Sequence, residues 1–209
     1  MKLLHQIGTI MLLGMKLQVY FLLKTLMGGI VLGIFPAFFG SFRIITKCIT
    51  ERDVEHMYLL KELKQFNKKE FIKTNLLGYI FLIWTYILMV NIWVSQYFFE
   101  VRIFNWFTIG FLILTASIAL YVVALFTKYE LPIKQYILQG FLCSIIGILE
   151  TVAIVLGIGI ATGLAIAVPL IGFSMGIPLL ILPHALFSRV VITRLERVFY
   201  KMVGQEEQK

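Results

Sequence analysis

The sequence predicts an all-α integral membrane protein, a bundle of five transmembrane helices with a cytoplasmic basic helical loop between spans one and two. Of the 209 residues, 60% are apolar and 14% are charged, and the mean hydropathy is +0.92. Such a composition is typical of chains that cross a bilayer several times. The one long charge-rich segment between apolar runs covers residues 43–75, and it separates the first span from the second.

The apolar runs place five spans in a single membrane domain. They lie at about residues 17–40, 76–97, 106–127, 137–158 and 168–188. The stretch 136–188 carries a single charge, and as one helix it would measure about 75 Å against about 30 Å of hydrocarbon, so we assign two spans to it. We expect the break at 157–169, with Pro169 in the first turn of the fifth span, which Pro178 and Pro183 should kink.

The distribution of basic residues predicts the orientation. The loop 43–75, the turn 128–134 and the tail 189–209 together carry 15 of the 19 Lys and Arg residues. By the positive-inside rule these three segments face the cytoplasm, so the N-terminus lies outside and the C-terminus is cytoplasmic. Because the positive charges lie beside long apolar runs, the net charge of +8 indicates membrane flanks and not nucleic-acid binding.

The basic loop is predicted to contain a helix over residues 54–66, with Asp53 as its N-cap. We weigh two interpretations of this loop equally. In the first it lies on an anionic inner leaflet, with its lysines toward lipid phosphates, and in the second it docks a protein partner. The residues that would form this interface are Tyr58, Leu63, Phe66, Lys68, Lys69 and Phe71.

Two charges, Lys24 and Glu150, fall inside predicted spans, where an ionised side chain is costly unless it is paired or hydrated. Counted along their helices, both lie at about 10–12 Å below the outer surface. Small residues at helical spacing flank each of them, which favours close approach of two membrane helices. We therefore predict an intramembrane ion pair between Lys24 and Glu150, either as a structural bridge or as part of a solute path.

Motifs for catalysis or for metal binding are missing from the sequence. It contains no P-loop, no HExxH, no Gly-x-Ser-x-Gly and no clustered pair of acids. Cys48 and Cys143 are expected at different depths and match no metal-site spacing. We therefore expect no enzyme activity, no metal and no cofactor.

Several short motifs, taken in order, give the chain a family resemblance. They are Gly-Ile-Phe-Pro-Ala at 33–37, Lys-Thr-Asn-Leu-Leu-Gly at 73–78, the segment 121–131, Lys-Gln-Tyr at 134–136, and the closing segment 189–196. With these motifs the chain resembles the YesL family of bacterial multi-span membrane proteins, over nearly its whole length.

The resemblance implies a role in carbohydrate transport. It suggests an accessory subunit of a carbohydrate ABC importer in the bacterial plasma membrane, with permease and ATPase subunits as partners. The chain lacks the coupling loop of importer permeases, so it does not resemble the permease itself. The alternative is a small autonomous channel or transporter with Lys24 and Glu150 on the path.

Overall fold

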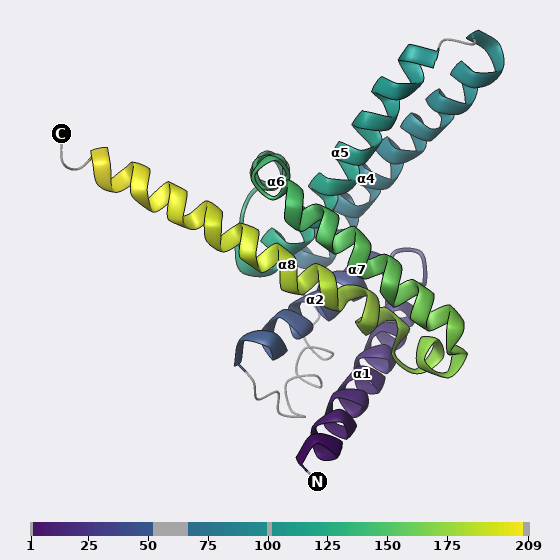
Figure 1. Ribbon diagram of the computed structural model, residues 1–209, viewed down its shortest axis with the longest axis vertical. Helices are drawn as coiled ribbons and strands as arrows, with labels where there is room; N and C mark the ends of the chain where they lie inside the picture. Colours follow the sequence, from purple (N-terminus) through teal and green to yellow (C-terminus); the bar gives the residue numbers. More distant parts are fainter. Residues whose placement is uncertain (1, 52–66, 100–101, 207–209) are drawn as a thin grey trace.

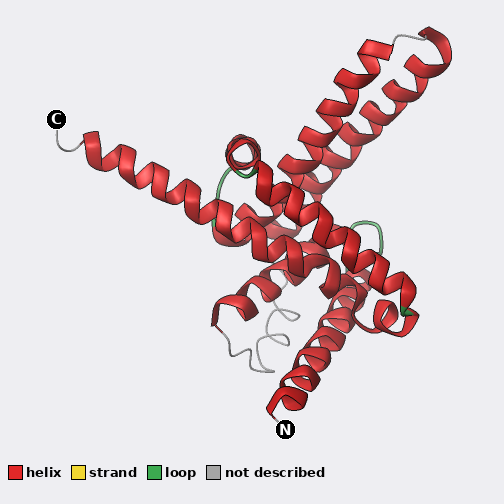
Figure 2. Ribbon diagram, viewed as in Figure 1, coloured by secondary structure: helices red, strands yellow, loops and turns green. Residues whose placement is uncertain are grey.

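The computed structural model describes residues 2–51, 67–99 and 102–206, and most of them are helical (Figures 1 and 2). Short turns separate the helices, and no strand occurs within these ranges. The helices are α1 (Lys2–Met27), α2 (Ile34–Glu51), α4 (Lys68–Val94), α5 (Arg102–Lys128), α6 (Ile133–Ile146), α7 (Ile148–Ala167) and α8 (Pro169–Glu206), with a π-helical turn, η1 (Ser95–Phe99), after α4. The predicted loop helix at 54–66 lies outside the described residues.

Among the residues that the structure describes, four helical segments are long and apolar enough to cross a membrane. They are Lys68–Tyr97, Phe104–Lys128, Ile148–Ala167 and Pro169–Arg197. By length and composition these segments indicate a multi-pass membrane protein, because about 20 apolar residues are needed to cross the hydrocarbon. The predicted count of five spans is not confirmed.

The first predicted span, 17–40, is wrong as a single helix. α1 ends at Met27, and after a tight turn α2 begins at Ile34. Gly29 and Ile30 adopt positive φ values of 78° and 58°, which reverse the chain direction. The hydroxyl of Tyr79 on α4 donates to the Val31 carbonyl at 3.0 Å, which fixes this turn against the neighbouring helix.

The fourth predicted span, 137–158, is also interrupted. Gly147 separates the short helix α6 from α7, which continues to Ala167. The Tyr121 hydroxyl donates to the Gly147 carbonyl at 2.9 Å and lies 2.9 Å from the Thr151 hydroxyl, so it holds the break from both sides. Gly147 suits this position because a Cβ there would lie only 2.5 Å from the Tyr121 hydroxyl.

The last predicted boundary agrees better with the structure. α8 begins at Pro169, as expected from the suitability of proline for a first helical position. The kink in α8 lies at Met175 (φ −148°, ψ 24°), three residues before Pro178. Since the proline ring clashes with the preceding turn, Pro178 accounts for this kink, whereas the helix around Pro183 has no such departure.

Two helical hairpins extend in different directions from a common centre (Figure 1). One joins α4 to α5 through η1, and the other joins α7 to α8 at Val168. At the centre, Phe42 of α2 lies against His184 of α8, with ring centroids 4.6 Å apart, and Nε2 of His184 lies 2.8 Å from the Leu120 carbonyl of α5. These buried contacts join α2, α5 and α8 into one core.

Candidate functional site

The described parts of the three basic segments meet around the beginning of α4. The Arg43 guanidinium of α2 pairs with the Glu70 carboxylate of α4. Nζ of Lys128, at the end of α5, lies 2.7 Å from Oε1 of Glu196 on α8, and the Tyr129 hydroxyl donates to the same carboxylate. Segments that are far apart in the sequence therefore share one charged surface.

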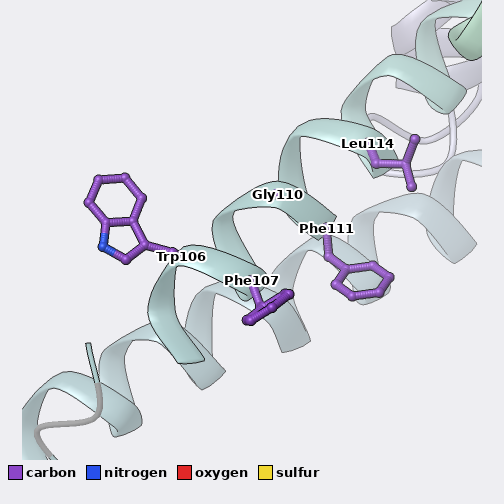
Figure 3. A pocket seen from close by; sticks show the side chains of 5 residues that line it. All are labelled: Trp106, Phe107, Gly110, Phe111 and Leu114. Carbon is purple, nitrogen blue, oxygen red and sulfur yellow. The ribbon is translucent and has the colours of Figure 1, made fainter. Parts of the chain in front are cut away.

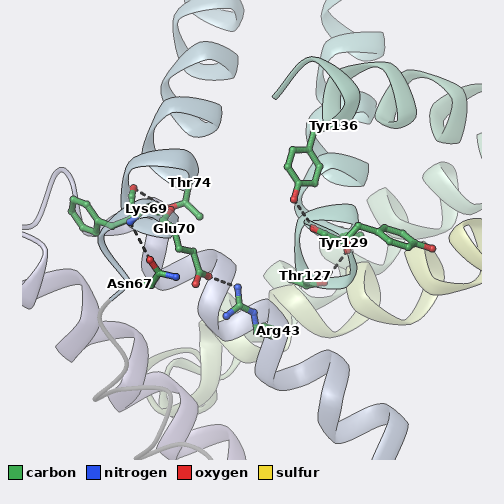
Figure 4. Close-up of polar contacts among 10 residues, drawn as sticks. Arg43, Asn67, Lys69, Glu70, Thr74, Thr127, Tyr129 and Tyr136 are labelled. Atoms are coloured by element: carbon green, nitrogen blue, oxygen red, sulfur yellow. Dashed lines mark hydrogen bonds and ion pairs between the residues drawn. The ribbon is translucent and has the colours of Figure 1, made fainter. Parts of the chain in front are cut away.

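A cleft of about 380 Å³ opens within this surface. Its walls come from α2, the start of α4, and the link between α5 and α6 (Figure 4). The lining residues are Arg43, Asn67, Lys69, Glu70, Lys73, Phe126, Thr127, Lys128, Tyr129, Glu130 and Tyr136. Four of them are cationic and two are acidic, so the cleft has a positive balance. We call it the basic cleft.

Local hydrogen bonds shape the two sides of the basic cleft. On one side Asn67 caps α4, and its Oδ1 accepts from the backbone N–H of Lys69 at 3.1 Å. On the other side the buried Tyr136 hydroxyl donates to the Tyr129 carbonyl and accepts from the Leu131 N–H at 3.0 Å. Burial raises the pKa of Tyr136. Its two hydrogen bonds hold the link between α5 and α6.

The predicted interface residues fall in two groups. Tyr58, Leu63 and Phe66 lie outside the described residues. Lys68 and Lys69 are exposed at the start of α4, and Lys69 lines the basic cleft. Phe71 is half-buried, and its ring lies beside Gly28 in the turn between α1 and α2, so this side chain contributes to packing.

The structure gives Glu150 a partner that the sequence analysis missed. Glu150 lies in the first turn of α7, and its Oε1 is 2.6 Å from Nη2 of Arg194 on α8. Only 12% of the Glu150 side chain is exposed, and its Oε2 is buried without a hydrogen-bond partner. Arg194 thus takes the place expected for Lys24, which is half-buried in the last turn of α1.

The helix break at Gly147 explains the change of partner. It makes Glu150 one of the first residues of α7, whereas the sequence analysis placed Glu150 within a longer span. The chain turns back at Val168, and α8 then runs past the start of α7. Arg189 and Arg194 lie on this part of α8. The expected break before Pro169 was therefore the signal that could have identified Arg194 as the partner of Glu150.

A second cleft, of about 440 Å³, runs along this part of α8. It is lined by Leu186, Arg189, Val190, Thr193, Arg194 and Arg197. These residues recur at three- and four-residue spacing, so they share one face of the helix. In the part of the chain that the structure describes, no group of three or more His, Cys, Asp or Glu side chains is placed to hold a metal ion.

The N-terminal half of α5 bears an apolar groove of about 440 Å³ (Figure 3). It is lined by Trp106, Phe107, Gly110, Phe111 and Leu114. Trp106 is 73% exposed, and a Cβ added at Gly110 would meet no atom within 4 Å. The groove therefore faces the surroundings of the chain and not its core.

Comparison with known proteins gives a match to a protein family. No curated protein matches the chain, and no solved structure does. A family model described as "Protein of unknown function, DUF624" matches residues 15–92, a region that holds the second half of α1, all of α2 and most of α4. The matched region includes α2 and the start of α4, which line part of the basic cleft.

Proposed function

We propose that this protein is a YesL-family accessory subunit of a carbohydrate ABC importer in a bacterial plasma membrane. It carries out no reaction itself and binds the importer permease through its spans and the ATPase side through the 43–75 loop. The motifs at 33–37 and 73–78 that carry the resemblance lie within the matched region 15–92, which supports the family assignment.

The observation that carries this proposal is the exposure of two apolar helices. In α4 and α7 only 11% of the most apolar stretch is buried, against 39% in α5. Exposed apolar helix faces of this size contact lipid or the spans of another protein. A subunit that works by lateral association needs such faces, whereas an autonomous transporter needs an enclosed polar path.

A separate exposed feature, the groove on α5, best suits a partner helix. Gly110 lies among aromatic side chains, and a small residue at such a place lets a second membrane helix approach closely. Aromatic residues around a small one also supply the large apolar contact area that anchors an interface. We assign this groove to a span of the permease.

The proposed orientation places the basic cleft in the cytoplasm and the N-terminus outside. Gly14 lies beside Met175, close to the outer turn at Val168, and Gly28 lies beside Phe71, close to the inner start of α4. These contacts support a course of α1 from the outer to the inner side of the membrane. On this proposal α1 is the fifth membrane span, in addition to the four candidate segments, and α2 lies on the cytoplasmic side.

The test compares two Gly→Leu variants by co-purification from native membranes with mass spectrometry. Gly110→Leu fills the α5 groove, and Gly8→Leu makes the same change on α1, where a Cβ also meets no atom within 4 Å. We expect Gly110→Leu to reduce the recovered importer subunits about tenfold, because overfilling an interface costs on the order of 1–3 kcal/mol. Gly8→Leu should recover them as the unaltered chain does, because α1 is not one of the two exposed helices.

Two results would contradict the proposal. One is that the unaltered chain is recovered alone and that its deletion leaves sugar uptake unchanged. The other is a solute flux that depends on Lys24 and Glu150 in liposomes that contain this chain alone. Such a flux would establish an autonomous transporter instead. Both Gly→Leu variants should unfold at or above the temperature of the unaltered chain, because leucine favours helix over glycine.

A further inference from the structure

The basic cleft lies where two candidate membrane spans end. The span of α4 begins at Lys68, and that of α5 ends at Lys128. Its lining includes Lys69, Glu70 and Lys73 at the start of the first span and residues 126–130 around the end of the second. Because lipid headgroups lie just beyond the hydrocarbon-spanning segments, the cleft opens at the level of the lipid phosphates.

Two of the four cations in the cleft already have carboxylate partners. Arg43 pairs with Glu70, and Lys128 pairs with Glu196. Lys73 makes a long contact of 3.4 Å from Nζ to the Leu131 carbonyl, which leaves most of its donor capacity unused. The side chain of Lys69 is exposed, and it lies on the same face of α4 as Lys73, one turn away.

The remaining features of the cleft also suit an anion with an apolar extension. The capped N-terminus of α4 opens beside it, and the aligned peptide dipoles there favour negative charge. Phe126 and Tyr136 supply a buried, largely apolar part of its wall. The volume of about 380 Å³ is within the range of sites that hold small molecules.

We propose that the basic cleft binds the phosphate headgroup of one anionic phospholipid. Lys69 and Lys73 contact the phosphate, and Arg43 and Lys128 add positive charge at the rim of the cleft. Phe126 and Tyr136 pack against the first carbons of the lipid chains. Basic pockets between membrane helices bind phospholipid headgroups through this combination of charge and position. The site does not depend on an importer partner, so its test is separate from that of the proposed function.

The experiment titrates the purified full chain in neutral detergent micelles with dioleoyl phosphatidylglycerol or dioleoyl phosphatidylcholine and counts bound lipids by native mass spectrometry. We expect one phosphatidylglycerol to remain bound at concentrations at which phosphatidylcholine does not. Lys69→Gln and Lys73→Gln should each weaken that binding about fivefold, the effect of one lysine near an anionic lipid. Lys134→Gln is the matched control, because Lys134 is exposed just beyond the α5–α6 link but does not line the cleft.

Three outcomes would overturn the proposal. Equal weakening by the control and by the two cleft variants would mean general attraction between a basic surface and anionic lipid. Equal retention of both lipids would mean that no headgroup site exists. Displacement of the bound lipid by millimolar glycerol phosphate, with equal affinity for that soluble ester alone, would assign the cleft to a soluble phosphate. Since Lys69 is exposed, its variant keeps the fold and decides the test even where Lys73→Gln does not fold.

Discussion

Replacement of Gly33 by alanine is expected to destabilise the protein by about 3 kcal/mol or more, because overfilling a packed turn costs at least 1–3 kcal/mol. A Cβ at Gly33 would overlap the backbone carbonyl of Thr25, and a Cβ at Gly28 would overlap the Cα of Gly33. Both obstacles are backbone atoms of the same tight turn, so no side-chain rotation relieves them. The turn between α1 and α2 would have to open.

Thermal unfolding of the purified protein in detergent measures this effect. The matched control is Gly159→Ala on α7, where a Cβ meets no atom within 4 Å. The control should be neutral or slightly stabilising, since alanine favours helix over glycine by about 1 kcal/mol. Equal unfolding temperatures for the two variants would mean that residues 28–33 do not form the tight turn and that α1 continues into α2.

This turn also shows where the sequence falls short as a guide to the fold. Residues 17–40 are apolar nearly throughout, and the glycines at 28, 29 and 33 are equally compatible with close helix packing and with a chain reversal. Hydropathy measures only whether a segment avoids water, and both arrangements satisfy that requirement. The contacts of the turn with Tyr79 and Phe71, about 40 residues later, decide between them.

Other parts of the fold follow from local rules. The helical segments Lys68–Tyr97 and Phe104–Lys128 contain the runs 76–97 and 106–127, because each run is continuously apolar and bounded by charge. Pro169 marks the start of α8 because proline suits a first helical turn. In contrast, the basic cleft depends on how four chain segments meet, and charge content alone predicted only that they share one side of the membrane.

Reversal of the charge at Glu150 is the second change with a large expected effect. Glu150→Arg would place a cation in a largely buried site that faces Arg194. Loss of a buried pair costs on the order of 3–5 kcal/mol, but half of the Arg194 side chain is exposed, so we expect about 2 kcal/mol here. Arg194→Glu should cost a similar amount, because it brings two carboxylates together and leaves Glu150 without its partner.

The double variant Glu150→Arg/Arg194→Glu should recover much of the lost stability, since it restores an ion pair of opposite polarity. Recovery should be incomplete, because a cation in the first turn of α7 is disfavoured by the helix dipole by about 0.3–1 kcal/mol. The comparison is Lys24→Glu/Glu150→Lys, which should recover nothing, because the partner of Glu150 lies on α8. Recovery of stability in this second double variant alone would mean that Lys24 is the partner of Glu150, as the sequence predicts. Recovery in the first pair alone would establish that the α7–α8 hairpin, and not a contact between α1 and α7, neutralises the buried carboxylate.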